Sequence, residues 1–253
     1  MVVSKTVAAK PRPHKIFLPD SIRYPGDGHK WQATVACDFH NVIVDWDHPI
    51  ADYINKIHPD AKIDPSKHRF YDIGHDPTVA ISPREWADLF PEFCASTPGY
   101  RGLPLIEGMR EQLWTIKEAG IGIEIMTYVP GVTSILSDNM MALRTGVAQR
   151  QTLELIESLD LPIDIRKDVK FVAPHDKPRR MSEKHIPLLI EDNAATAALA
   201  RNMALATLLV PTSSNQITCP NVLRLKSRNE VATRVIEFFE PLREAGLLLE
   251  GRR

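Results

Sequence analysis

Polar side chains that could do chemistry stand directly after the apolar segments of this sequence. Asp38 ends the run TVACD, and Thr127 ends the run IGIEIMT. Lys177 comes a few residues after VKFVA, and the acidic pair Glu191 and Asp192 follows IPLLI. Because the carboxyl ends of parallel strands meet at one edge of a sheet, we expect these side chains to converge on one crevice.

The residue types in this set suit phosphoryl chemistry. Carboxylates are hard oxygen ligands for magnesium, and a carboxylate can also attack phosphorus. An ammonium and a hydroxyl can hold the phosphoryl oxygens while charge develops on them. His40 and Tyr128 lie beside two of the strand ends. The sequence therefore predicts a magnesium-dependent site for a phosphate ester.

Strands and helices alternate regularly in the part of the chain that carries these residues. Apolar runs predict strands at 34–38, 121–127, 169–173, 186–190 and 205–210. Helices are predicted at 107–120, 147–159, 178–184, 194–204 and 230–242. Gly120 marks the end of the first of these helices. This alternation predicts an α/β fold built on a doubly wound, mainly parallel sheet.

Residues 45–102 interrupt the alternation and predict a small inserted cap domain. One helix is expected over 49–57, where apolar residues recur at helical spacing. Another is expected to begin after Ser82, because Ser82 and Glu85 have the spacing of a capping box and Pro83 occupies the first helical position.

The rest of the chain divides around this insertion. Segments 31–44 and 103–253 form the predicted core domain, and residues 1–30, rich in Pro, Gly and Lys, form a predicted extended arm. The basic start of the arm has some likeness to an organelle presequence. Its two prolines, Pro11 and Pro13, favour a flexible tail instead.

The composition is that of a soluble globular protein. The chain has 31 Lys and Arg against 32 Asp and Glu, so its charge predicts neither a nucleic-acid nor a membrane partner. Cys37, Cys94 and Cys219 form no CxxC pair, which predicts neither a disulfide framework nor a zinc site and favours a reducing, cytoplasmic setting. No apolar run approaches the roughly 18 residues of a membrane span. The sequence leaves a homodimer open.

Four short motifs give the sequence a resemblance to the haloacid dehalogenase-like superfamily. Its first motif, a strand followed by DxDx and two apolar or Thr positions, is matched by DFHNVI at Asp38. The later motifs are matched in order by Thr127, by Lys177 and by the acidic pair of LLIEDN. Within the superfamily, GLPLIEGMREQLWTIKEAGIGIEIMT, the DK-to-LLIEDN spacing and LLVPTSSNQ resemble the 5'(3')-deoxyribonucleotidase-like group. The likeness covers residues 33–240 or so.

The resemblance implies a role for each matched residue. Asp38 would attack phosphorus to form an aspartyl-phosphate, while Thr127 and Lys177 would hold the phosphoryl oxygens. Mg²⁺ would be held by the Asp38 carboxylate, the backbone carbonyl of His40, Asp192 and, as a helper, Glu191. The implied partner is a small phosphorylated substrate, with a nucleoside monophosphate first among the candidates.

His40 departs from the family pattern. Phosphatases of the superfamily carry a second aspartate at this position, which protonates the leaving oxygen and later activates water. An imidazole, with an unperturbed pKa of about 6.5, can make both proton transfers. The substitution leaves open a competent phosphohydrolase, a weak or inactive phosphate-binding or regulatory protein, and a different reaction on the same scaffold. A phosphatase of a non-nucleotide metabolite is a further alternative.

Some of these assignments have competitors within the sequence. The site lysine rests on spacing alone, and Lys170 and Lys184 are its rivals. The aromatic residues of the insertion, including Tyr71 and Trp86, could form a small core. Alternatively, Tyr71 and Trp86 would bind the substrate by stacking on a nucleobase, and Tyr128 would also bind the substrate.

Overall fold

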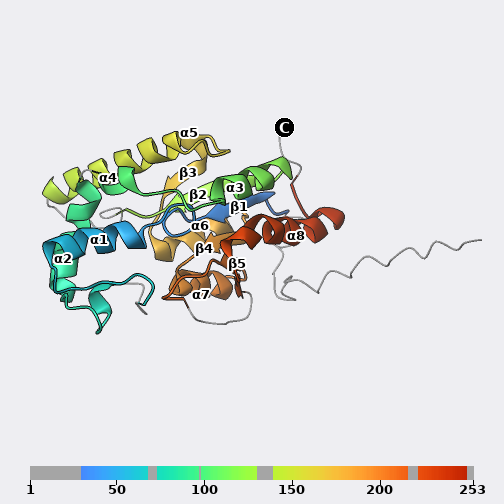
Figure 1. Cartoon of the computed structure of the whole chain (residues 1–253). Coiled ribbons are helices and arrows are strands. Elements are labelled where there is room, and N and C mark those ends of the chain that lie inside the picture. Colours follow the sequence, from blue (N-terminus) through green and yellow to red (C-terminus); the bar gives the residue numbers. More distant parts are fainter. Residues whose placement is uncertain (1–29, 68–72, 97, 130–138, 216–221, 250–253) are drawn as a thin grey trace, which may run out of the picture.

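The structure, a computed structural model, describes residues 30–67, 73–96, 98–129, 139–215 and 222–249. The predicted arm, apart from Lys30, and the predicted substrate residue Tyr71 lie outside these ranges. One six-stranded sheet forms the centre, with the strand order β3-β2-β1-β4-β5-β6 (Figure 1). Its strands are β1 (Thr34–Cys37), β2 (Gly122–Thr127), β3 (Val169–Phe171), β4 (Leu188–Glu191), β5 (Ala206–Leu209) and β6 (Val222–Arg224).

The sheet is parallel throughout, and its central strands are buried on both faces. Every residue of β4 and β5 is buried, which is why these strands, apart from Glu191 and Thr207, are apolar on both faces and show no alternation. Strand β1 pairs with β2 on one side and β4 on the other, and Cys37 lies level with Ile125 and Ile190. The register therefore brings the residues that follow β1 and β4 and the last residue of β2 together at one edge.

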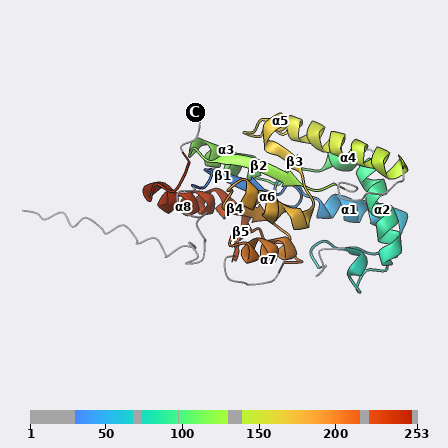
Figure 2. The same ribbon diagram turned by 180° about the vertical axis from the view of Figure 1, so that it is seen from behind.

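Helices cover both faces of the sheet, so the predicted doubly wound α/β architecture is confirmed (Figures 1 and 2). Helices α3 (Met109–Glu118) and α8 (Val231–Glu244) pack together on one face, and α6 (Lys177–Glu183) and α7 (Ala194–Asn202) pack together on the other. This division follows from the right-handed crossovers of parallel strands. Gly120, with a φ of 75°, follows α3 as predicted.

The insertion after β1 folds mainly into helices that lie beyond one end of the sheet in both views (Figures 1 and 2). It contains α1 (Asp47–Ile57), η1 (Ile73–His75), α2 (Pro83–Ala95) and η2 (Gly99–Gly102). The predicted capping box is present at the start of α2, where the Ser82 hydroxyl accepts a hydrogen bond from the Glu85 N–H and the Glu85 carboxylate accepts one from the Ser82 N–H.

Helix α4 (Asn139–Ser158), which follows β2 in the chain, packs against the insertion. The side-chain amide of Gln151 donates to the carbonyl of Ser96, at the end of α2, and its oxygen accepts from the N–H of Arg101 in η2. The guanidinium of Arg101 forms an ion pair with Glu154. The insertion and α4 therefore form one connected helical layer.

Local sequence patterns missed some boundaries. Helix α4 begins at residue 139 rather than 147, and the short α5 (Ile165–Asp168) and β6 were not predicted. Strand β6 has three residues, too few for a period-2 pattern to be recognised, and its place depends on pairing with β5. None of the helices in the described part of the chain combines the length and the apolar character that a bilayer span requires.

Candidate active site

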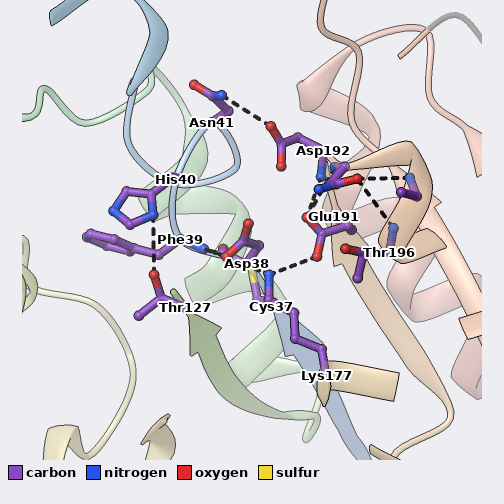
Figure 3. Close-up of polar contacts among 12 residues, drawn as sticks. Cys37, Asp38, Phe39, His40, Asn41, Thr127, Lys177, Glu191, Asp192 and Thr196 are labelled. Atoms are coloured by element: carbon purple, nitrogen blue, oxygen red, sulfur yellow. Dashed lines mark hydrogen bonds and ion pairs between the residues drawn. The ribbon is translucent and has the colours of Figure 1, made fainter. Parts of the chain in front are cut away.

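Asp38 stands at the end of β1, in the middle of the sheet edge where the strands finish (Figure 3). Its backbone N–H donates to the carbonyl of Ile190 at 2.9 Å, which continues the pairing with β4 by one residue. The Phe39 N–H donates to Asp38 Oδ1 at 2.8 Å. Asp38 is only 3% exposed, so the fold places an acidic side chain in the interior and fixes its orientation with a backbone donor.

Lys177 is the cation of this cluster. Its Nζ lies 2.9 Å from Asp38 Oδ1 and 2.8 Å from Glu191 Oε2, and all three side chains are buried. Burial by itself lowers the pKa of the Lys177 ammonium, but the two carboxylates outweigh burial and raise the pKa above its ordinary value. Lys177 therefore carries a full positive charge in contact with the carboxylate of Asp38. The rival Lys184 instead pairs with Glu124 on β2.

Glu191 and Asp192 have different surroundings although they are neighbours. Glu191 Oε2 bonds to Lys177, and Glu191 Oε1 accepts hydrogen bonds from the N–H groups of Asp192 and Asn193. Both oxygens of Glu191 are thus engaged. Burial, reinforced by Asp38 and opposed by Lys177, raises the pKa of Glu191 to about 7.

In the part of the chain that the structure describes, one oxygen of Asp192 has no hydrogen-bond donor. Its Oδ2 accepts from the side-chain amide of Asn41 at 3.1 Å (Figure 3). Its Oδ1 is buried and has no hydrogen-bond partner among the described residues. Burial raises the pKa of Asp192 well above the usual range, and the charges of Glu191 and Asp38 raise it further. A buried carboxylate oxygen without a partner is costly unless a ligand satisfies it.

The cluster fits a divalent cation. Asp38, Glu191 and Asp192 can each place one oxygen so that the three atoms lie within 4.8 Å of one another. Among the described residues, three buried carboxylates face one buried ammonium, that of Lys177, and such an excess of buried negative charge calls for compensation. Carboxylate oxygens are the ligands that Mg²⁺ and Ca²⁺ prefer. The orphaned Oδ1 of Asp192 and the hard-oxygen donor set therefore both agree with a bound Mg²⁺.

His40 and Thr127 form the other side of the site. The imidazole Nδ1 lies 3.3 Å from the Thr127 hydroxyl (Figure 3). The ring is also packed against Phe39, Trp46 and Tyr100, with ring centroids 4.9–5.4 Å apart. Burial, opposed by Asp38 and assisted by Lys177, lowers the pKa of His40 to about 4. The imidazole is therefore neutral at pH 7, and its buried Nε2 has no hydrogen-bond partner in the described part of the chain.

A cavity of about 210 Å³ opens onto Asp38, Lys177 and Glu191. Its other walls include the predicted substrate residues Trp86 and Tyr128. The wall contributed by the insertion is largely aromatic; its rings are Trp46, Trp86, Phe90 and Tyr100. A larger cavity of about 420 Å³ lies at the opposite ends of β1 and β2, and none of the strand-end cluster lines it. The smaller cavity is therefore identified as the candidate active site by the residues that line it and not by its volume.

Sequence reasoning missed several side chains that the fold adds to the site. Asn41 bonds to Asp192, and Trp46, Asp47 and Tyr100 line the cavity. Asn41 lies in the polar break after β1, which was a detectable signal, whereas Tyr100 has no spacing that relates it to the strand ends. The presence of Tyr100 in the cavity wall depends on the path of the insertion across the sheet edge.

Comparisons with known proteins find similarity only in structure. No protein-family model matches the sequence. No curated protein matches it either. A HAD family hydrolase from Deinococcus radiodurans, solved with bound phosphate and sodium, is 16% identical, with 87% of this chain and 99% of that chain covered and a TM-score of 0.46.

Two other solved structures give a similar result. A haloacid dehalogenase-like family hydrolase from Streptococcus pneumoniae is 12% identical, with 83% of this chain and 99% of that chain covered and a TM-score of 0.48. A predicted phosphoglycolate phosphatase from Haemophilus somnus is 10% identical, with 80% and 97% covered and a TM-score of 0.41. Likenesses of this size establish no function, which is therefore inferred from the side chains of the strand-end cluster.

Proposed function

We propose that the protein is a magnesium-dependent phosphomonoester hydrolase of the haloacid dehalogenase type, working through an aspartyl-phosphate on Asp38. The observation that carries the proposal is the contact of Asp38 with a buried lysine, beside an Asp192 oxygen that has no described protein partner. A phosphoryl group in the cavity would meet the Asp38 carboxylate and the Lys177 ammonium, and the Thr127 hydroxyl lies 3.3 Å from His40, which also lines the cavity.

The two oxygens of Asp38 have different tasks in this proposal. Oδ1 is held by the Phe39 N–H and by Lys177, so Oδ2 is the oxygen that attacks phosphorus. The new Oδ2–P bond forms as the P–O bond to the alcohol breaks, and Lys177 and Thr127 hold the non-bridging oxygens. The departing alkoxide takes a proton from solvent at pH 7, where His40 is neutral, and from the protonated imidazole of His40 at lower pH. Attack of water on the phosphorus of the aspartyl-phosphate then releases phosphate and restores Asp38.

Magnesium would be held by the carboxylates of Asp38 and Asp192 together with the backbone carbonyl of His40. When bound, the cation neutralises negative charge on the phosphoryl group and on the carboxylates. Because both Glu191 oxygens already bond to Lys177 and to backbone N–H groups, we propose that Glu191 supports the lysine and contributes to the cation through its charge.

The insertion at 45–102 acts in this proposal as a cap that selects the substrate, and a nucleoside monophosphate is the first candidate. Its base would stack on Trp86, which lines the cavity beside Phe90. The cavity volume of about 210 Å³ favours a second candidate, a smaller non-nucleotide phosphomonoester. Ligand pockets commonly reach about 300–1,000 Å³, so a nucleotide requires the cap helices to move outward.

The partly buried, neutral His40 favours one alternative, a protein that binds phosphate esters but turns them over slowly or not at all. The leaving oxygen would then lack a ready proton donor at pH 7. A reducing cytoplasmic location, based on the cysteine pattern, and the absence of nucleic-acid and membrane partners, based on the balanced charge, remain further proposals, and so does a homodimer.

Turnover tests the proposal directly. Purified protein with MgCl₂ is incubated with p-nitrophenyl phosphate, small alkyl phosphates, ribonucleotides and deoxyribonucleotides, and phosphate release is measured. We expect release that EDTA stops and that Asp38→Asn abolishes, because an amide cannot attack phosphorus. Asp88→Asn, the same change at an exposed position on α2, is the control and should keep wild-type activity. If neither the wild type nor Asp38→Asn releases phosphate, the enzyme proposal is refuted.

The nucleotide candidate has its own comparison within the same assay. Trp86→Ala should raise the KM for nucleotides more than the KM for small alkyl phosphates, because an alkyl group, unlike a nucleobase or a nitrophenyl ring, cannot stack on the indole. Trp114→Ala removes a tryptophan that is 41% exposed on α3 and should change neither value. An equal effect of Trp86→Ala on both substrate classes would exclude base stacking on this residue.

A further inference from the structure

Asn41 occupies the turn between β1 and the insertion, in a backbone conformation that few residue types accept. Its φ is 54°, in the left-handed region, and it is 7% exposed. Asparagine tolerates this region better than most residues with a side chain, although glycine accepts it more readily. Backbone conformation alone would favour glycine here, so the amide side chain is the feature that needs an explanation.

All of the polar groups in the Asn41 side chain are in use. Its Nδ2 donates to Asp192 Oδ2 at 3.1 Å and to Asp47 Oδ1 at 2.8 Å. Its Oδ1 accepts from the N–H groups of Trp46 and Asp47, at 3.0 and 3.2 Å. The amide cannot be turned over without placing its oxygen against two carboxylates, so this network determines its orientation. The backbone carbonyl of Asn41 also accepts from the Arg228 guanidinium at 3.1 Å.

These contacts fix the rotation of the Asp192 carboxylate. The bond from Asn41 occupies Oδ2, and the other oxygen, Oδ1, is left without a described partner on the side of Asp38 and Glu191. A neutral amide is suited to this position because it stands between two carboxylates, Asp192 and Asp47, and donates to both.

The same amide also holds the start of the insertion. Trp46 and Asp47 begin α1, and both line the cavity. Their N–H groups are satisfied by Asn41 Oδ1, which therefore serves in place of a side-chain cap for this helix. One side chain thus joins a carboxylate of the cation cluster to the wall of the substrate cavity.

We infer that Asn41 is a positioning residue for the divalent cation: it orients Asp192 so that Oδ1 faces the metal, and it ties the first turn of α1 to that carboxylate. This inference rests on the metal site of the proposed function. Residues that orient metal ligands typically contribute about 10- to 100-fold to metal affinity or activity.

The test compares Asn41→Gly with the wild-type protein by calorimetric titration of the EDTA-treated chain with MgCl₂ alone. Glycine keeps the left-handed turn and removes only the amide, so the dissociation constant for Mg²⁺ should rise by at least about tenfold. The EDTA-treated variant should keep the circular dichroism spectrum of the wild type, so that the lost affinity reflects the missing amide and not a loss of fold.

Lys62→Gly is the matched control. Lys62 is also a non-glycine residue with a positive φ, 48°, but it is exposed in the insertion. This variant should keep the wild-type dissociation constant for Mg²⁺. Should Asn41→Gly fail to fold by circular dichroism, Asn41→Ser replaces it, since the serine side chain is shorter and must weaken Mg²⁺ binding in the same way.

The outcomes separate this inference from the proposed function. A folded Asn41→Gly protein that binds Mg²⁺ within twofold of wild type overturns the inference, and so does wild-type protein that binds no Mg²⁺. Wild-type protein that binds Mg²⁺, loses affinity in Asn41→Gly and releases no phosphate from any ester supports the inference while the proposed function fails.

Discussion

Lys177→Met should destabilise the protein strongly, and by an amount that depends on pH. Methionine keeps most of the aliphatic side chain and removes the ammonium that lies 2.9 Å from Asp38 and 2.8 Å from Glu191. Two buried carboxylates then lose their counter-charge. Removing one partner from a buried ion pair costs about 3–5 kcal/mol, because the remaining charge stays buried and uncompensated.

The magnitude can be compared with the effect of the same change at Lys184, which lies at the other end of the same helix, α6. Lys184 pairs with Glu124, but its side chain is 36% exposed. Pairs that water reaches contribute about 0–1 kcal/mol, so Lys184→Met should have little effect. A loss of 3–5 kcal/mol corresponds to a fall in Tm of roughly 6–20 °C for a chain of this size.

The pH dependence follows from the pKa of Glu191, which burial raises to about 7. In the unfolded chain a glutamate has a pKa of about 4.3. Between about pH 4.3 and about pH 7 the folded state therefore binds more protons than the unfolded state, and the free energy of unfolding falls as pH rises. Without Lys177 the folded pKa of Glu191 rises further, and the fall continues above pH 7. The difference in stability between wild type and Lys177→Met should therefore be larger at pH 8 than at pH 5.5.

Urea unfolding followed by circular dichroism, in EDTA and at both pH values, measures this difference. Wild type, Lys177→Met and Lys184→Met are compared under identical conditions. The reasoning is refuted if the two lysine variants unfold at the same urea concentration, or if the deficit of Lys177→Met is the same at pH 5.5 and pH 8. Phosphate release should in addition be lost in Lys177→Met and kept in Lys184→Met.

Two further changes have defined outcomes. Burial lowers the pKa of His40 to about 4, so the fraction of protonated imidazole should rise by up to about tenfold per pH unit as pH falls from 7 to 5. An alkyl phosphate needs a proton donor for its leaving oxygen more than p-nitrophenyl phosphate does. The ratio of kcat for the alkyl phosphate to kcat for p-nitrophenyl phosphate should therefore rise in parallel. His40→Asn should abolish that trend, and a wild-type ratio that is constant with pH would contradict it. Ser82→Ala removes the capping box of α2 and should cost about 1 kcal/mol, or roughly 2–4 °C in Tm, with kcat for p-nitrophenyl phosphate unchanged. An unchanged Tm in a melting experiment would show that this cap does not stabilise the fold.

Features that depend on neighbouring residues could be predicted from the sequence. The start of α2 is one example, since Ser82, Pro83 and Glu85 determine it within four positions. The strands are another, because a run of apolar residues long enough to cross a buried sheet is visible without knowledge of its partners. From the strands, the parallel sheet and the convergence of Asp38, Thr127 and Glu191 follow by topology.

Tertiary structure was needed wherever the contacts of a side chain depend on residues that are distant in the chain. Spacing alone left Lys170, Lys177 and Lys184 as candidates, and only the fold places the Lys177 ammonium between Asp38 and Glu191. The fold also gives the neighbouring residues Glu191 and Asp192 different surroundings. Glu191 bonds to Lys177, and Asp192 bonds to Asn41, which lies 151 residues earlier in the chain.

The surroundings of His40 illustrate the physical reason. Its residue type suggested an acid and base near pH 7, but the fold packs the imidazole against Trp46 and Tyr100 and lowers its pKa to about 4. Sequence determines which groups follow each strand, because periodicity and capping are local. Burial, charge neighbours and side-chain direction are set by contacts across the whole chain, and these decide how each group at the strand ends behaves.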